Sequence, residues 1–378
     1  MTPAPLRYKL APYGEAWIGN GAFSIVYRAT EEGSGKKVAI KKSRVSKKVQ
    51  RPALQHEIRI LQLLQGHVAI PAVYGYGHLE HFEYMSMELL GPSIAEQQKE
   101  GAGVMVKTVI QILDQALAAL QHIHALGIVH RDVKPENLLC SADDSFTIKI
   151  IDFGISKPFS HGHPTKYDPL KERRHITGSI YWASLNSHNG IDLAPRDDLE
   201  SLALVALYLL RGSLPWKPRP RLESQARSQE IVRVMKTSCS EPDLCIGFPK
   251  EFGDLLSYSR SLQIHQFPDY QALRLSFANL AERVDHTTDN GPLDWTACYP
   301  NPSGPILDEP EFSENDEDDG TDSSDDDRPK DSYRGMDCDQ WDRLGNRDKD
   351  VTLPSQQEVE LDNITPLIVE VHVPWCDW

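Results

Sequence analysis

Two short segments hold enough polar side chains, closely enough spaced, to carry out chemistry. The first, "VHRDVKPENLL" (129–139), places His, Arg, Asp, Lys and Asn in a proline-containing stretch between apolar residues. The second, "IKIIDFGISK" (148–157), is an apolar run that delivers Asp152. Such a density of polar groups beside a core is costly unless it is used. Asp132, Asn137 and Asp152 are two acids and an amide, a set that suits Mg²⁺ bound together with substrate phosphates.

Weaker signals lie upstream, and each has a plainer alternative. "GNGAFS" (19–24) is a glycine turn, which is most often an ordinary hairpin but also lets the backbone lie close to nucleotide phosphates. "VAIKK" (38–42) is either a strand with exposed lysines or a strand that presents Lys41 to phosphates. Glu57 lies in the helical segment that follows, where it either pairs with Arg59 on the surface or holds Lys41.

The elements that must position these residues change character along the chain. Residues 8–90 show strand patterns, rich in β-branched residues, around one helical segment that stops at Gly66. From about 104 the apolar residues recur at helical spacing, first in a long amphipathic segment closed by Gly127. Further helical segments are predicted at 197–211, 225–237, 249–262 and 268–284. The pattern predicts an α+β fold with two lobes, a small β-rich N-lobe with one helix and a larger, mainly helical C-lobe.

In this order, the motifs resemble those of a eukaryotic protein kinase. A glycine loop, V-A-I-K, a helix glutamate, H-R-D-x-K-x-x-N and D-F-G follow one another over 19–154. The casein kinase 1 family is more similar still, as its segments resemble "MELLGPS" (87–93), "TGSIYWASLN" (177–186), "RDDLESL" (196–202) and "GSLPW" (212–216). In that family Ser-Leu-Asn takes the place of the Ala-Pro-Glu found in many kinases. The resemblance runs from about Tyr8 to about Val284.

The resemblance implies a domain organisation. A kinase domain is expected over 11–286, with an N-lobe of about 11–90 and a C-lobe of about 91–286, after an N-terminal extension at 1–10. Residues 287–362 are expected to be an acidic, disordered tail, because they contain too few apolar residues to order themselves. Residues 363–378 alternate apolar and polar side chains and are expected to be a docking segment.

The resemblance also implies an activity, the transfer of the ATP γ-phosphoryl group to serine or threonine hydroxyls with Mg²⁺. Asp132 would accept or orient the hydroxyl proton, and Lys134 would neutralise charge on the transferred group. Asn137 and Asp152 would hold Mg²⁺, while Lys41, held by Glu57, would grip the phosphates. Asp198 would brace the catalytic loop. The remaining ATP-binding residues implied by the resemblance are Ile18, Gly19, Asn20, Gly21, Ser24, Val26, Ala39, Met87, Glu88, Leu90 and Leu139.

Two positions depart from the family pattern. The third glycine of the phosphate loop is Ser24, a mild change because serine fits a tight turn. Tyr181 stands where the family has an arginine that helps to bind the phosphate of an already phosphorylated substrate. The basic candidates that remain for such an anion are Lys157 and Arg174, with Lys236 as a third. Substrates rich in acidic residues or phosphoserine are therefore still expected, with less dependence on a priming phosphate.

The chain's acidity is concentrated at its C-terminal end. Residues 301–378 contain 23 acidic and 6 basic residues, whereas residues 1–300 contain 32 and 34. Ser323 and Ser324 follow an acidic run, so the tail is either a solubilising segment or one that docks intramolecularly on the basic site. Tethering would supply a local concentration on the order of millimolar.

Composition also bears on nucleic-acid binding, membrane insertion and cellular compartment. The balance of charge gives no support for nucleic-acid binding, and the longest apolar run, at 202–210, is too short to span a membrane. The scattered cysteines and the absence of an apolar N-terminal segment indicate a reducing compartment, so cytoplasmic or nuclear localisation and a monomer are expected.

Three rival functions remain beside the protein kinase. A pseudokinase would use the fold and the acidic tail for binding, but such proteins usually lack Lys41, Asp132 or Asp152, which are all present. A small-molecule kinase fits the segments at 87–93 and 212–216 less well. The tail could also be a docking platform for basic partners.

Overall fold

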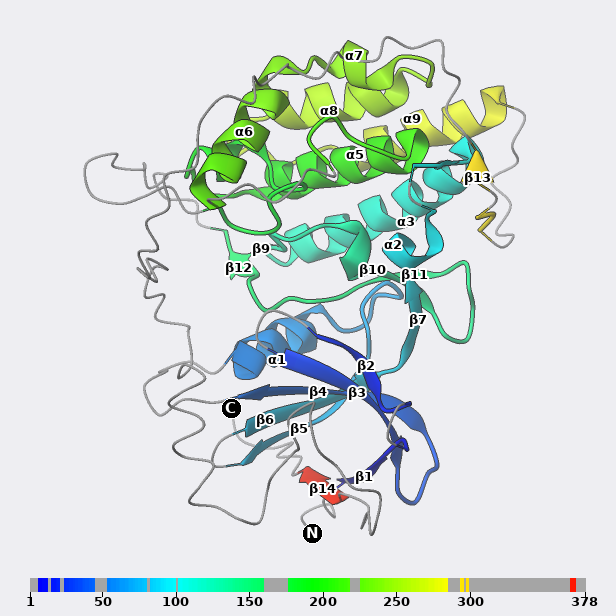
Figure 1. Ribbon diagram of the computed structural model, residues 1–378, viewed down its shortest axis with the longest axis vertical. Coiled ribbons are helices and arrows are strands. Elements are labelled where there is room, and N and C mark those ends of the chain that lie inside the picture. Colours follow the sequence, from blue (N-terminus) through cyan, green and yellow to red (C-terminus); the bar gives the residue numbers. More distant parts are fainter. Residues whose placement is uncertain are drawn as a thin grey trace, which may run out of the picture. The chain divides into compact units, whose positions relative to one another are not determined.

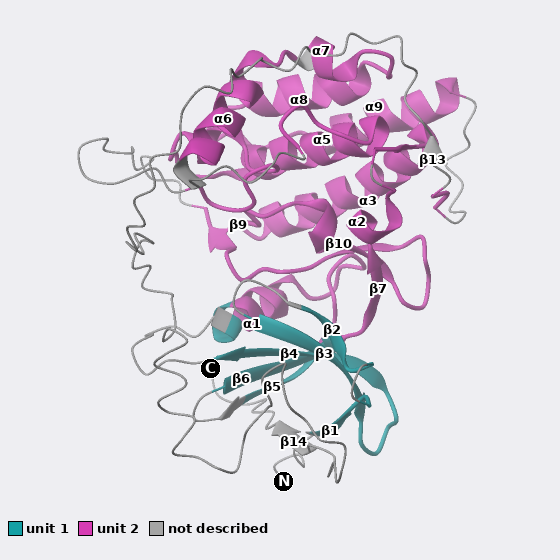
Figure 2. Cartoon of the chain, in the orientation of Figure 1, with its two compact units in different colours: residues 1–56, 74–87, 306–378 teal, residues 57–73, 88–305 magenta. Residues whose placement is uncertain are grey.

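The structure is a computed structural model, and it divides the chain into two compact units (Figure 2). The first unit comprises residues 1–56, 74–87 and 306–378, and the second comprises residues 57–73 and 88–305. The residues that the structure describes are 6–12, 15–20, 24–44, 53–79, 82–99, 101–159, 176–217, 225–284, 293–295, 297–298 and 368–371.

The described residues of the first unit form a seven-stranded sheet (Figure 1). Its strand order is β14-β1-β3-β4-β6-β5, and β2 pairs with β3 outside this path. The strands are β1 (Leu6–Leu10), β2 (Trp17–Asn20), β3 (Ser24–Glu31), β4 (Lys37–Arg44), β5 (Val73–Leu79), β6 (Phe82–Glu88) and β14 (Ile368–Val371). The sheet therefore joins segments from both ends of the chain, because β14 pairs antiparallel with β1 along Leu6–Lys9.

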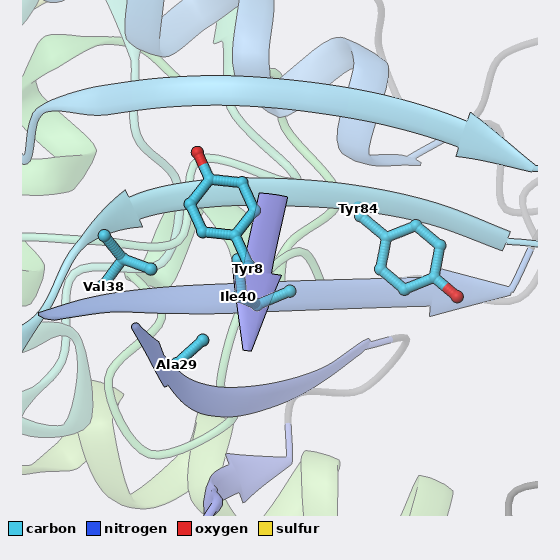
Figure 3. Packing of buried hydrophobic residues seen from close by; sticks show 5 residues of the cluster. All are labelled: Tyr8, Ala29, Val38, Ile40 and Tyr84. Carbon is cyan, nitrogen blue, oxygen red and sulfur yellow. The ribbon is translucent and has the colours of Figure 1, made fainter. Parts of the chain in front are cut away.

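The core of this sheet is an apolar cluster of Tyr8, Ala29, Val38, Ile40 and Tyr84, contributed by four strands (Figure 3). The Tyr8 hydroxyl lies 2.8 Å from Ser86 Oγ, so the one polar atom of this buried ring has a partner. Burial raises the pKa of Tyr84 to about 12. The contacts of Tyr8 tie β1 into the sheet.

The central strand, β4, is buried on both faces, which contradicts the alternative of a strand with exposed lysines. Lys41 is 9% exposed and Lys42 is 7% exposed. The Lys42 Nζ lies 3.8 Å from the centroid of the Phe82 ring, and burial, reinforced by the charge of Arg44, lowers its pKa to about 8. A buried lysine is tolerated here because its ammonium faces an aromatic ring.

The second unit is mainly helical (Figure 1). Its helices are α2 (Ile94–Gln97), α3 (Val106–Ala125), α4 (Leu185–His188), α5 (Pro195–Arg211), α6 (Gln225–Ser238), α7 (Glu241–Cys245), α8 (Glu251–Ser261) and α9 (Tyr270–Arg283). The helix α1 (Ala53–Leu64) crosses the boundary between the units.

The long helices α3 and α5 form the centre of the second unit. Almost all of the apolar run at 202–210 is buried within α5. The chain leaves α3 through Gly127 at φ 74°, a left-handed conformation that glycine adopts without steric cost. Among the described residues, none of the helices combines the length and apolar character that a membrane crossing requires.

Small β-ladders in the second unit position the two polar segments. One ladder has the order β11-β10-β7, formed by β11 (Ile148–Ile150), β10 (Leu138–Ser141) and β7 (Leu90–Ser93). Another pairs β12 (Lys157–Pro158) with β9 (Ile128–Val129), and a third pairs β13 (Ala297–Cys298) with β8 (Gly103–Val104). His130 directly follows β9, and Asp152 comes two residues after β11, so the polar residues of each segment lie just beyond the end of a short strand.

The predicted α+β fold is confirmed. One unit is a β-sheet and the other is mainly helical, and helices begin and end within a few residues of the predicted ranges.

Candidate active site

Asp132 lies at the centre of the polar segment and is held by three neighbours. Lys134 donates from Nζ to Asp132 Oδ2 at 2.6 Å, and the Asn137 amide donates to the same oxygen at 3.2 Å. Ser179 donates to Oδ1 twice, from its backbone N–H at 2.9 Å and from its hydroxyl at 2.8 Å. Both carboxylate oxygens are therefore oriented, while the side chain keeps 10% of its surface exposed.

The loop at 130–137 is fixed through His130. We call it the catalytic loop after the role that the resemblance implies. The Asp132 N–H donates to His130 Nδ1 at 3.2 Å, which leaves the proton of the ring on Nε2, where it is donated to the Ile151 carbonyl at 3.0 Å. The ring also meets Phe153 edge-on, with 4.8 Å between centroids. One buried histidine thus couples the catalytic loop to the residues on both sides of Asp152.

Arg131 and Asp152 adopt left-handed backbone conformations, with φ of 71° and 68°. For a residue other than glycine this conformation costs about 1–2 kcal/mol. Arg131 is held by its own N–H, which donates to Asp198 Oδ1 at 2.8 Å, and by its Nε, which donates to the Ile155 carbonyl at 2.6 Å. Strain held in this way often marks a functional site.

The carboxylate that holds Arg131 belongs to Asp198, near the start of α5. Its Oδ2 accepts the His130 N–H at 2.7 Å and pairs with His124 Nε2 at 2.8 Å. Burial alone raises the pKa of Asp198, but the hydrogen bond and electrostatic attraction of His124, together with the Arg131 N–H, bring the pKa below its ordinary value. Asp198 is therefore an ionised carboxylate that holds the backbone N–H groups of His130 and Arg131.

Asn137 and Asp152 supply the oxygen atoms that a hard cation would need. The Asn137 Nδ2 donates to Asp132, so its amide oxygen is the atom left for a cation. The Ile151 N–H donates to the Asn137 carbonyl at 3.0 Å, which ties the two segments together. A Cβ at Gly154 would lie 3.6 Å from Asp152 Oδ1 and 3.8 Å from Glu57 Oε2, so both carboxylates approach this glycine. Within the described residues, no group of three or more His, Cys, Asp or Glu side chains could hold a metal ion. An amide oxygen and a carboxylate suit Mg²⁺, which usually takes one or two protein ligands together with substrate phosphates.

The first unit brings together several of the ATP-binding residues implied by the resemblance. Gly19, Val26 and Lys41 are neighbours across β2, β3 and β4, since Gly19 pairs with Val26 and Val26 pairs with Lys41. Ala39 lies two residues before Lys41 on β4, where it pairs with Arg28. The others described in this unit are Ile18 and Asn20 on β2, Ser24 on β3 and Met87 on β6. Gly21 lies outside the described residues.

The segment at 88–90 is held in place by contacts of Glu88. The Glu88 carboxylate pairs with Lys149 Nζ at 3.0 Å and accepts the Ala72 N–H at 3.0 Å, while its own N–H donates to the Ala72 carbonyl at 2.8 Å. Leu90 and Leu139 lie on the paired strands β7 and β10. The second unit thus brings together Glu88, Leu90 and Leu139, and separately Asp132, Lys134, Asn137 and Asp152.

The segment "TGSIYWASLN" lies directly against the catalytic loop. A Cβ at Gly178, whose φ is 86°, would lie 2.4 Å from the Arg131 carbonyl oxygen, so this approach requires glycine. The Ser184 hydroxyl and the Asn186 amide donate to Asp197 Oδ1 at 2.7 and 2.9 Å. Burial raises the pKa of Asp197 to about 6, against these hydrogen bonds. Ser184 and Asn186 of the Ser-Leu-Asn sequence therefore bind this segment to α5 through Asp197.

The candidate anion-binding residues differ in their surroundings. Lys157 is exposed on β12, where it pairs with Val129 just before the catalytic loop. Arg174 lies outside the described residues. Lys236 is fully buried and donates to two backbone carbonyls, so its assignment as a candidate for a substrate anion is wrong.

Two residues that matter here escaped the sequence reasoning. Ser179 touches Asp132 across 47 positions of sequence, and Asp197 receives Ser184 and Asn186. The only signal for Ser179 was a hydroxyl directly after a glycine, which many turns share. For Asp197 the sequence offered no separate signal, because it is adjacent to Asp198. Adjacent helix residues point in different directions, so the two carboxylates bind different segments.

A family model described as "Protein kinase domain" matches residues 14–266, about two thirds of the chain. This range contains Lys41, Glu57, Asp132, Asn137 and Asp152.

Proposed function

The chain belongs to the protein kinase family, a family of phosphotransferases, and from that premise we propose that it phosphorylates serine and threonine hydroxyls of acidic or phosphorylated proteins. The observation that supports this most directly is the orientation of Asp132 by Lys134, Asn137 and Ser179. The casein kinase 1 likeness of the segments at 87–93, 177–186 and 212–216 supports the choice of acceptor.

In this proposal Asp132 orients the acceptor hydroxyl and accepts its proton. One of its oxygens already accepts a serine hydroxyl, that of Ser179, at 2.8 Å. Lys134 keeps its ammonium 2.6 Å from the same carboxylate and 3.1 Å from Ser179 Oγ, where it would offset negative charge on the transferred group. ATP bound with Mg²⁺ would supply the phosphoryl group and the charge neutralisation. Asn137 and Asp152 would hold the metal ion, and Lys41 would bind the phosphates.

The preference for an acidic or primed substrate rests on Lys157, which is exposed beside the catalytic loop, and on Arg174. Tyr181 offers no positive charge, so we propose that a priming phosphate is favoured only weakly. A charge-assisted, bidentate contact from arginine would give a stronger preference.

The test is the rate of phosphoryl transfer from Mg-ATP to two peptides that differ only in carrying phosphoserine or serine three positions before the acceptor. Asp132→Asn is the control for contaminating activity. Transfer by the unaltered protein that is lost in the control supports the proposal. If the unaltered protein transfers phosphate to neither peptide but still binds other proteins through the kinase fold or the acidic tail, the pseudokinase is favoured. A strong preference for the primed peptide would contradict the weak dependence on priming.

We also propose that the acidic C-terminal region restrains the enzyme. The pairing of β14 with β1 supports this, because it attaches residues beyond the acidic run to the first unit by backbone hydrogen bonds. A tethered acidic segment would compete with acidic substrates at high local concentration. We further propose that the protein acts as a monomer in the cytoplasm or nucleus, without binding nucleic acid or membranes.

A further inference from the structure

Lys236, on α6, is a lysine without access to solvent. Its residue exposure is 0%, and its Nζ donates to the Ile180 carbonyl at 3.1 Å and to the Ala183 carbonyl at 2.6 Å. The Nζ also lies 3.3 Å from His188 Nε2 and 5.6 Å from the centroid of the Trp216 ring. A group buried this deeply is costly unless its donors are used, and here they are used on one short segment.

The same segment receives two more donors from other parts of the unit. The Trp216 indole N–H donates to the Tyr181 carbonyl at 3.0 Å, and His188 Nε2 lies 3.1 Å from the Ile180 carbonyl. The carbonyls of Ile180, Tyr181 and Ala183 thus each have a side-chain partner. These carbonyls follow Ser179, the residue whose hydroxyl donates to Asp132.

The contacts of Lys236 with backbone carbonyls do not compete with an ion pair. Within the described part of the chain, no carboxylate lies at ion-pair distance from its Nζ. Glu200, the acid whose charge acts on Lys236, pairs with Arg260 at 3.1 Å and accepts the Leu185 N–H at 3.2 Å. Burial lowers the pKa of Lys236 to about 7, Glu200 opposes this change and Arg260 adds to it. Both the ammonium and the neutral amine have the two N–H donors that the carbonyls need.

We propose that Lys236 is a positioning residue for the acceptor peptide: it fixes the backbone of Ile180–Ala183 so that Ser179 reaches Asp132 and the acceptor lies along this segment. The inference deepens the proposed function and rests on it. In this role Lys236 acts on the peptide-binding surface through the backbone that it holds, and it does not contact a substrate anion.

The first test substitutes Lys236→Met, which keeps the length of the side chain and removes its donors. We expect KM for the acceptor peptide to rise about tenfold or more, which is the effect of losing one or two hydrogen bonds. KM for ATP should stay within twofold of the unaltered value. Lys250→Met is the matched control, because Lys250 is an exposed lysine that pairs with Asp254 one turn along α8. A Lys236→Met protein with equal changes in both KM values, or with none, would overturn the proposal.

The second test needs no catalysis and so separates this inference from the proposed function. Amide hydrogen exchange is measured on the full chain without nucleotide or peptide. Trp182 and Ala183 donate their N–H groups to the Ser179 carbonyl, and these amides should exchange about tenfold faster in Lys236→Met, while those of α3 keep their rates. Unchanged rates at Trp182 and Ala183 would refute the role.

If Lys236→Met fails to fold, so that the α3 amides exchange as well, Trp216→Phe serves instead. It removes one donor to the Tyr181 carbonyl and keeps an aromatic ring in place. The same local pattern is expected with a smaller increase, and protection equal to that of the unaltered protein would again count against the proposal.

Discussion

The brace beneath the catalytic loop gives the sharpest quantitative prediction. Asp198 accepts three hydrogen bonds, from His130 N, Arg131 N and His124 Nε2, at 2.7, 2.8 and 2.8 Å. In Asp198→Asn the shape is retained, but one carboxylate oxygen becomes an NH₂ group. With the remaining oxygen facing His130 and His124, that NH₂ faces the Arg131 N–H, donor against donor.

The cost has two parts. A buried N–H left without an acceptor costs about 1–3 kcal/mol, and two hydrogen bonds that lose their charge weaken by about 1 kcal/mol each. We therefore expect the free energy of unfolding to fall by about 3–5 kcal/mol, a range measured when a buried charged partner is removed. Arg131 also loses the contact that holds its φ at 71°, so phosphoryl transfer should fall as well.

The assay is urea unfolding followed by fluorescence, with kcat measured on the same preparations. Asp114→Asn is the matched control, since Asp114 pairs with Arg274 at 2.7 Å with about two fifths of both side chains exposed. An ion pair of that kind contributes about 0–1 kcal/mol. If Asp198→Asn lost no more stability than Asp114→Asn, the brace would not act as described.

Four further outcomes are expected. Asp152→Ala should abolish phosphoryl transfer to peptide, because Mg²⁺ would lose a carboxylate ligand and the charge of the phosphates would no longer be neutralised. Near-normal turnover would contradict the assignment. Ser179→Ala removes a hydroxyl 2.8 Å from Asp132 Oδ1, so kcat should fall about tenfold or more, which a peptide assay checks. Burial, with the charge of Lys236, lowers the pKa of His188 to about 3, so the unfolded chain binds the extra proton as pH falls below 6.5. Between pH 7 and 5 this group should destabilise the fold by about 2 kcal/mol, and His188→Gln should remove that loss in urea titrations. Removing residues 301–378 should raise peptide phosphorylation at low salt; unchanged activity would exclude restraint by the tail.

The parts of the site that could be predicted from the sequence are those in which neighbours in sequence are also neighbours in space. Asp132, Lys134 and Asn137 lie within six residues, and the hydrogen bonds among them are local. The strand–turn and helix patterns were also local, so the two kinds of unit followed from periodicity.

What could not be predicted depends on contacts across long stretches of sequence. Lys236 meets Ile180 across 56 positions and Ala183 across 53. A lysine near the end of a polar helix is usually exposed, so nothing in α6 indicated burial. The burial of Lys42 was missed for a similar reason, because it depends on the Phe82 and Tyr84 rings of another strand.

The left-handed backbone at Asp152 affects how substitutions there should be interpreted. Asparagine and aspartate tolerate this conformation better than other residues with a side chain. Alanine scanning at Asp152 would therefore change two things together, the charge of the side chain and the preference of the backbone. Asp152→Asn removes the charge and keeps the conformational preference, whereas Asp152→Gly removes the charge and relaxes the backbone. Comparing the two variants separates electrostatics from geometry at a position where a single truncation confounds them.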